Sequence, residues 1–202
     1  MVKALPRVGA VARFAPAVTE LPVAVNGLML VEMEPPGQIN LRGDPSDQRF
    51  LRAAGAVLNC RLPVGPNTVQ SSDDVTVLWL GPDEWLILTA PGDETDLIAR
   101  LRTALAELHA AVTDVSGNRA RLRLSGPHAR DVLAKGCGLD LHPSRFRTGQ
   151  CAQTILARTG IILHQVDDRP TFDLFPRRSF AEYAWMWLKD AMAEYGGRTT
   201  AF

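Results

Sequence analysis

The sequence has no excess of charge of either sign and no long apolar run. Its 202 residues include 22 Lys and Arg against 22 Asp and Glu, so the formal net charge is zero. A neutral chain has no cationic surplus for non-specific binding to a nucleic-acid backbone. No segment approaches the roughly 20 uninterrupted apolar residues that a membrane-spanning helix requires. We therefore expect neither a nucleic acid nor a membrane among its partners.

Cysteine is also scarce. Cys60, Cys137 and Cys151 lie far apart in sequence, and no C-x-x-C pair occurs. A disulfide framework or a structural zinc site requires closer or paired cysteines. We expect reduced, partly buried thiols in a cytoplasmic protein, and no metal site in this chain.

Familiar catalytic motifs are absent as well. The sequence has no G-x-S-x-G, H-E-x-x-H, P-loop or G-x-G-x-x-G pattern. Asp114 and Ser116 lie near His128 in sequence, which formally offers a catalytic triad. Residues 114–118 are more typical of a hairpin turn whose polar side chains bond local backbone N–H groups. We therefore expect no catalytic and no cofactor-binding residue.

The chain does contain a repetition of its predicted elements. Turns and helix starts of the first half recur 83 to 86 residues later, pairing Gly43 with Gly126, Gly65 with Gly149 and Asp93 with Ser179. In each half the order is strand–helix–strand–strand–helix, with Asp44 predicted to cap the first helix. Short hairpins between the strands indicate mainly antiparallel sheets.

These patterns predict an α+β fold of two pseudo-repeated units. The expected boundaries are residues 23–110 for the first unit and 111–202 for the second, together one compact pair. Residues 1–22 are rich in Ala, Val and Pro, which predicts an extended N-terminal arm lying across another subunit. A frayed tail is the alternative.

An arginine strip and a pair of tryptophans are the candidate contact residues. Arg119, Arg121 and Arg123 alternate with apolar residues, so a strand would place all three on one face. That face is either solvated or a docking strip for an acidic partner or an anionic ligand. Trp185 and Trp187 stand about 160° apart on a helix, which favours one in the core and one at a contact.

Several motifs, in this order, resemble the folate-binding aminomethyltransferase superfamily. They are residues 112–116, 122–127 and 148–150. Within that superfamily, residues 40–44, 80–86 and 146–151 are most similar to the gamma subunits of heterotetrameric sarcosine oxidase. The resemblance covers about residues 25–197.

The resemblance implies a complex with alpha, beta and delta subunits. Such a complex oxidises sarcosine to glycine with flavins and passes the one-carbon unit to tetrahydrofolate. FAD, FMN, NAD, tetrahydrofolate and zinc are then expected on the partner subunits. Iron–sulfur repair relatives have a cysteine where this chain has Phe146, and an acidic residue where it has Cys151.

Those departures imply a scaffold retained as a non-catalytic assembly subunit. The alternative is a stand-alone folate-binding methyl- or aminomethyltransferase, in which the arginine strip attracts a polyglutamate tail.

Overall fold

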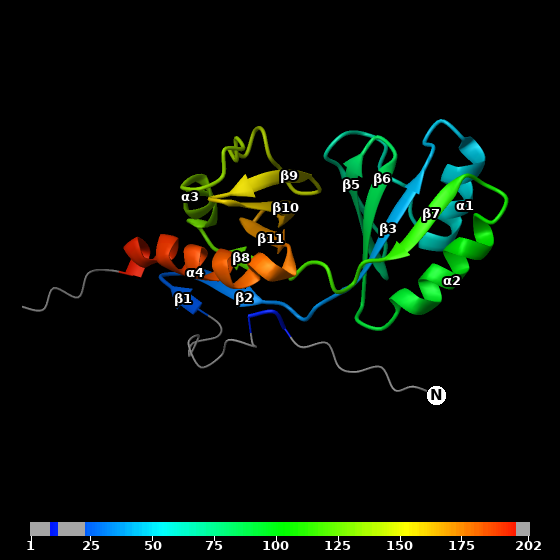
Figure 1. The fold of residues 1–202 in the computed structure, drawn as a ribbon. Coiled ribbons are helices and arrows are strands. Elements are labelled where there is room, and N and C mark those ends of the chain that lie inside the picture. Colours follow the sequence, from blue (N-terminus) through cyan, green and yellow to red (C-terminus); the bar gives the residue numbers. More distant parts are fainter. Residues whose placement is uncertain (1–8, 12–22, 197–202) are drawn as a thin grey trace, which may run out of the picture. The chain divides into compact units, whose positions relative to one another are not determined.

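A computed structural model describes residues 9–11 and 23–196, which divide into two compact units (Figure 1). We call them the six-stranded unit and the five-stranded unit, after their sheets. The six-stranded unit takes its residues from Met1–Pro35, Arg119–Thr148 and Thr154–Phe202, and the five-stranded unit from Pro36–Asn118 and Gly149–Gln153. Residues 23–35 therefore group with the C-terminal half of the chain, unlike the division at residue 110 expected from spacing.

The five-stranded unit is an antiparallel sheet with two helices. Its sheet order is β4-β5-β6-β3-β7, and each neighbouring pair is antiparallel. Along the chain its elements are β3 (Gly37–Gly43), α1 (Gln48–Leu58), β4 (Val69–Ser71), β5 (Val75–Gly81), β6 (Glu84–Thr89), α2 (Glu94–Ala104) and β7 (Ala110–Asp114).

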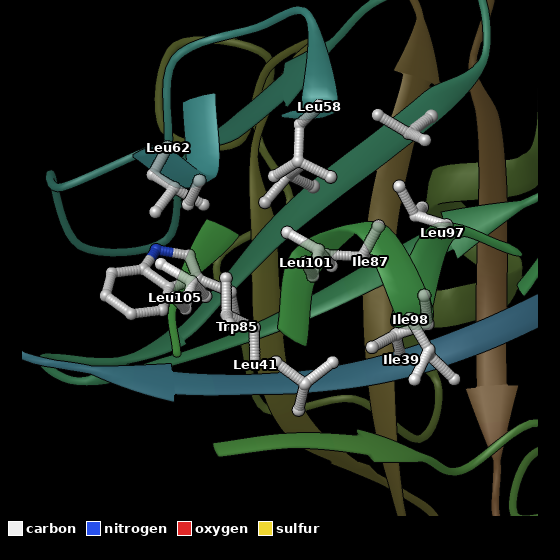
Figure 2. Close-up of a cluster of buried hydrophobic side chains, with 14 of the residues drawn as sticks. Ile39, Leu41, Leu58, Leu62, Trp85, Ile87, Leu97, Ile98, Leu101 and Leu105 are labelled. Atoms are coloured by element: carbon white, nitrogen blue, oxygen red, sulfur yellow. The ribbon is translucent and has the colours of Figure 1, made fainter. Parts of the chain in front are cut away.

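Apolar side chains from both helices and the sheet form the core of this unit. Figure 2 shows side chains of β3, β6, α1 and α2 meeting in one cluster. Trp85 is fully buried there, and its indole Nε1 donates to the carbonyl oxygen of Pro63 at 2.7 Å. Phe50, Ala54 and Leu58 recur every four residues, so they form one buried stripe of α1.

Helix α1 begins three residues later than its sequence suggested. Its N-cap is Asp47, whose side chain accepts from the backbone N–H of Arg49 at 2.8 Å. The predicted cap, Asp44, instead accepts from the backbone N–H of Ser46 in the preceding turn. Both aspartates bond the N–H two residues ahead, so local pattern alone does not distinguish a turn from a cap.

The six-stranded unit has sheet order β1-β2-β8-β11-β10-β9. Its strands are β1 (Val23–Val25), β2 (Leu28–Glu32), β8 (Leu122–Ser125), β9 (Cys151–Leu156), β10 (Thr159–Asp167) and β11 (Thr171–Pro176). Its helices are α3 (Ala129–Ala134) and α4 (Ala181–Met192), which follows the short 3₁₀ turn Arg178–Phe180. Strand β2 pairs antiparallel with β8, which brings residues 28–32 into this unit.

The predicted fold class is confirmed. The order β3-α1-β5-β6-α2 recurs as β8-α3-β10-β11-α4, with β4 and β9 as one further strand in each copy. The predicted arm, residues 1–22, lies outside the described residues except for residues 9–11. There Ala10 and Val11 are buried, and the backbone N–H of Val11 donates to the carboxylate of Glu32 at 2.9 Å.

Candidate functional site

The residues that formally offered a catalytic triad have other partners. Asp114 accepts from the backbone N–H and the hydroxyl of Ser116, at 2.9 and 2.5 Å. The Ser116 hydroxyl oxygen also accepts from the backbone N–H of Gln38 at 2.9 Å, and Ser116 is 4% exposed. The ring of His128 stacks on Tyr195 and contacts Asp131. The local bonds of Asp114 are those predicted for a turn. The predicted hairpin is wrong, because this segment joins β7, which pairs with β3, to β8, which pairs with β2 and β11 in the other sheet.

Two of the three strip arginines bind one buried carboxylate. Arg121 donates twice to Oδ2 of Asp173, at 2.9 and 2.6 Å. Arg123 lies directly opposite Asp173 in the β8–β11 register, and it donates to Oδ1 at 2.7 Å and to Oδ2 at 2.9 Å. Asp173 is 1% exposed. The arrangement is a buried ion cluster, which neither sequence interpretation of the strip anticipated.

Electrostatics keep the Asp173 carboxylate charged. Burial alone would raise the pKa of Asp173, but the hydrogen bond from Arg123 and the positive charges of both arginines outweigh it and lower that pKa. The third strip residue, Arg119, donates instead to the carbonyl oxygen of Phe175 at 3.2 Å. Contact of the three arginines with a partner subunit stays a prediction.

His164 borders the cluster from strand β10. It lies opposite Asp173 in the β10–β11 register. The pKa of His164 is lowered to about 4, mainly by burial; the Asp173 charge opposes this shift, and the charges of the two arginines add to it. The imidazole is therefore neutral at pH 7, which suits a packed structural group more than a proton-transfer group.

Phe146 lies where iron–sulfur repair relatives have a reactive cysteine, and it is a core residue. Phe146 is 4% exposed, and its ring stacks on Phe172 with centroids 6.4 Å apart. Arg130 donates to the Phe146 carbonyl oxygen at 3.2 Å and lies over the Phe172 ring. This position supplies packing and no nucleophile.

Cys151, at the position matched to an acidic residue of iron–sulfur repair relatives, is fully buried. Its thiol donates to the carbonyl oxygen of Trp79 at 3.3 Å. Burial raises the pKa of Cys151 to about 12. The thiol therefore stays protonated and cannot replace a carboxylate as a base or an anion.

The two tryptophans of α4 face different surroundings. Trp185 is fully buried in the core, whereas Trp187 is half-buried. A Cβ on Gly136 would lie 2.5 Å from the Trp187 ring, so the indole packs directly on that glycine. The outer side of the helix also carries exposed apolar residues: Phe180, Tyr183 and Met186.

The five-stranded unit has an apolar groove of about 510 Å³ beside α1. Leu51, Leu62 and Val64 line it, with Arg52 and Arg61 also on its wall. Within residues 9–11 and 23–196, no group of three or more His, Cys, Asp or Glu side chains is placed to hold a metal ion. Over the same ranges, no helix combines the length and apolarity needed to cross a membrane.

Comparisons with known proteins agree on one family. The model of the family described as "Sarcosine oxidase, gamma subunit family" matches residues 42–194. Sarcosine oxidase subunit gamma of Corynebacterium sp. (strain P-1) is 39% identical over 165 residues, 81% of this chain and 79% of that protein.

Solved structures give the same result at the level of the fold. A chain of the heterotetrameric sarcosine oxidase from Corynebacterium sp. U-96, in complex with pyrrole 2-carboxylate, superposes with a TM-score of 0.85 and 33% identity. The superposition covers 96% of this chain and 99% of that chain. Glycine cleavage system aminomethyltransferase T from Bartonella henselae has a TM-score of 0.60 and 18% identity, over 81% of this chain and 46% of that one.

Proposed function

The chain belongs to the sarcosine oxidase gamma subunit family, and on that premise we propose that it is the gamma subunit of a heterotetrameric, flavin-dependent sarcosine oxidase. The complex demethylates sarcosine to glycine and transfers the one-carbon unit to tetrahydrofolate. Within it, this chain is an assembly subunit that binds the alpha, beta or delta subunits. The observation that carries the proposal is the superposition over almost the full length of both chains.

The local chemistry supports a structural role for the chain. The position of a reactive cysteine holds the buried Phe146 ring, and the buried Cys151 thiol stays protonated. Arg121 and Arg123 bind Asp173, so they do not fit a folate polyglutamate tail. A zinc site does not fit either, because the described ranges place no group of three ligands together. We therefore assign FAD, FMN, NAD, tetrahydrofolate and zinc to the partner subunits.

We also propose a cytoplasmic location. Cys60, Cys137 and Cys151 are all free in the structure. Free thiols are the usual state of cysteine in a reducing compartment.

Co-expression with the other three oxidase subunits tests the assembly role. We expect one stoichiometric complex on size-exclusion chromatography, with sarcosine-dependent hydrogen peroxide formation in the same peak. The proposal fails if the other three subunits assemble and turn over normally while this chain elutes alone.

A stand-alone folate-dependent transferase is the weaker candidate. The chain superposes on less than half of the length of aminomethyltransferase T. Calorimetric titration of the isolated chain with tetrahydrofolate separates the two functions. We expect no saturable heat at high micromolar ligand; stoichiometric binding would favour the transferase.

A further inference from the structure

Helix α4 is apolar on two opposite sides. One side packs into the core of the six-stranded unit through Ala181, Ala184, Trp185, Leu188 and Met192. The other side carries Tyr183 and Met186, which are 38% and 48% exposed, and Phe180, 46% exposed, caps the start of the helix from the preceding 3₁₀ turn. A helix that is apolar on both sides is normally buried on both. The outer side is therefore unpartnered in the isolated chain.

The exposed apolar residues are contiguous on the helix surface. At 100° per residue, Phe180, Tyr183, Met186 and Trp187 fall within an arc of about 120°. The half-buried Trp187 is braced by Gly136, so this edge of the surface is rigid before any partner binds. Aromatic residues and Met are enriched where proteins bind one another, and rigid aromatics lose little entropy on binding. We call these four residues the α4 outer face.

The N-terminal end of the α4 outer face carries an exposed arginine, and the first turn of the helix carries Glu182. Arg177 is exposed one turn before the helix, and its backbone bridges to that of Arg119. The helix dipole adds partial positive charge at the same end. A complementary surface therefore combines an apolar pocket for the aromatics with carboxylates opposite Arg177.

The stoichiometry of the complex narrows the choice of occupant. In a heterotetramer of four different subunits there is one gamma chain, so a second copy is not available to cover this face. We propose that the α4 outer face and Arg177 dock onto an apolar, carboxylate-rimmed surface of one partner subunit of the oxidase. This inference rests on the proposed function, and it assigns the contact to particular residues.

A double variant of the full chain, with two substitutions in the same chain, tests the apolar part of the contact. Phe180→Ser with Met186→Ser removes exposed apolar area and leaves the buried side of α4 intact. The matched control is Ile155→Ser, since Ile155 is 60% exposed on β9 of the sheet. Each chain competes with differently tagged wild-type chain for the co-expressed alpha, beta and delta subunits. We expect about a 100-fold loss of competition for the pair, and less than about a twofold change for Ile155→Ser.

A charge reversal tests the electrostatic part. Arg177→Glu should weaken competition about tenfold at low salt, and the effect should shrink as salt is raised. The control is Arg158→Glu, an exposed arginine in the turn between β9 and β10. Unchanged far-ultraviolet circular dichroism and thermal midpoint show that every variant is folded.

The outcomes separate this inference from the proposed function. If wild-type chain assembles and the folded α4 variants compete equally well, the docking inference is overturned and the assembly role stands. If the wild-type chain does not assemble with the other subunits at all, the proposed function is refuted, and the docking inference is refuted as well because it rests on that function. If the isolated wild-type chain forms a dimer that Phe180→Ser with Met186→Ser dissociates, the face binds a second copy, which also overturns the inference.

Discussion

Replacing Asp173 by Asn measures what the buried ion cluster contributes to stability. Asn keeps the shape of the side chain but removes the charge, which leaves Arg121 and Arg123 as two adjacent cations. Removing one partner of a buried ion pair lowers the free energy of unfolding by about 3–5 kcal/mol. The arginine side chains are 24% and 27% exposed, so water weakens their repulsion and the lower end, about 3 kcal/mol, is expected.

The assay is urea and thermal unfolding of the purified chain at pH 7. A loss of about 3 kcal/mol lowers the thermal midpoint by about 6–12 °C for a chain of this size. The matched control is Asp83→Asn, because Asp83 pairs with Arg42 and both side chains are about half exposed, at 55% and 47%. That variant should leave the midpoint almost unchanged. An Asp173→Asn loss below about 1 kcal/mol would refute the reasoning.

A triple variant separates charge from packing. Arg121→Met, Arg123→Met and Asp173→Leu together replace the whole cluster with apolar side chains of similar size. Full replacement of a buried ion cluster is often neutral or stabilising, whereas removal of one member is not. We expect the triple variant to be more stable than Asp173→Asn. A triple variant that is less stable would indicate that the strands need the hydrogen bonds themselves.

Three further substitutions or labelling experiments address other sites. Burial lowers the pKa of His164 to about 4 in the folded chain, whereas the pKa of an unfolded histidine is about 6.5. Between these two pH values the unfolded state binds more protons than the folded state. The free energy of unfolding of the wild-type chain should therefore fall by about 2 kcal/mol from neutral pH to pH 5. His164→Gln should flatten that slope, and an unchanged slope would assign it to another group. Gly43→Ala should lower the free energy of unfolding in urea by about 1–3 kcal/mol, because the added Cβ would lie 2.3 Å from a ring carbon of Phe50. Gly138→Ala is the control and should leave that free energy unchanged, because a Cβ there would meet open space. In thiol titration at pH 8, Cys60 should react first, since Cys151 is fully buried with a pKa of about 12; fast labelling of Cys151 would contradict its burial.

The repeated element order was predictable because local chemistry marks it. Two glycine pairs and one helix start occur at nearly constant offsets in the two halves, and turns favour such residues wherever the chain reverses. The local turn at Ser116 was predictable for the same reason, since Asp114 bonds it two residues away. The hairpin expected there was wrong, because the strands on either side belong to different sheets. The family motifs lie on these same turns and strand ends.

Long-range pairing was not predictable from the pattern. Asp173 lies 50 residues from Arg123 in sequence, and no local periodicity indicates which carboxylate meets an alternating arginine strip. Likewise, the register of β2 against β8 joins Leu30 to Leu124. Sequence spacing therefore assigned residues 23–35 to the wrong unit.

The chain passes from one unit to the other after residues 35, 118, 148 and 153. Ribosomal synthesis delivers β1 and β2 first, and their partner β8 emerges about ninety residues later. An isolated two-stranded hairpin is only marginally stable in water. Strands β1 and β2 therefore remain without their partner strand β8 while residues 36–118 are synthesised. The five-stranded sheet and its two helices, which lie within residues 37–114, can therefore fold first and shorten the effective loop between β2 and β8. No single truncation of the gene yields either unit whole, and fragments cut at one point should expose the unpaired edge of β2 and aggregate.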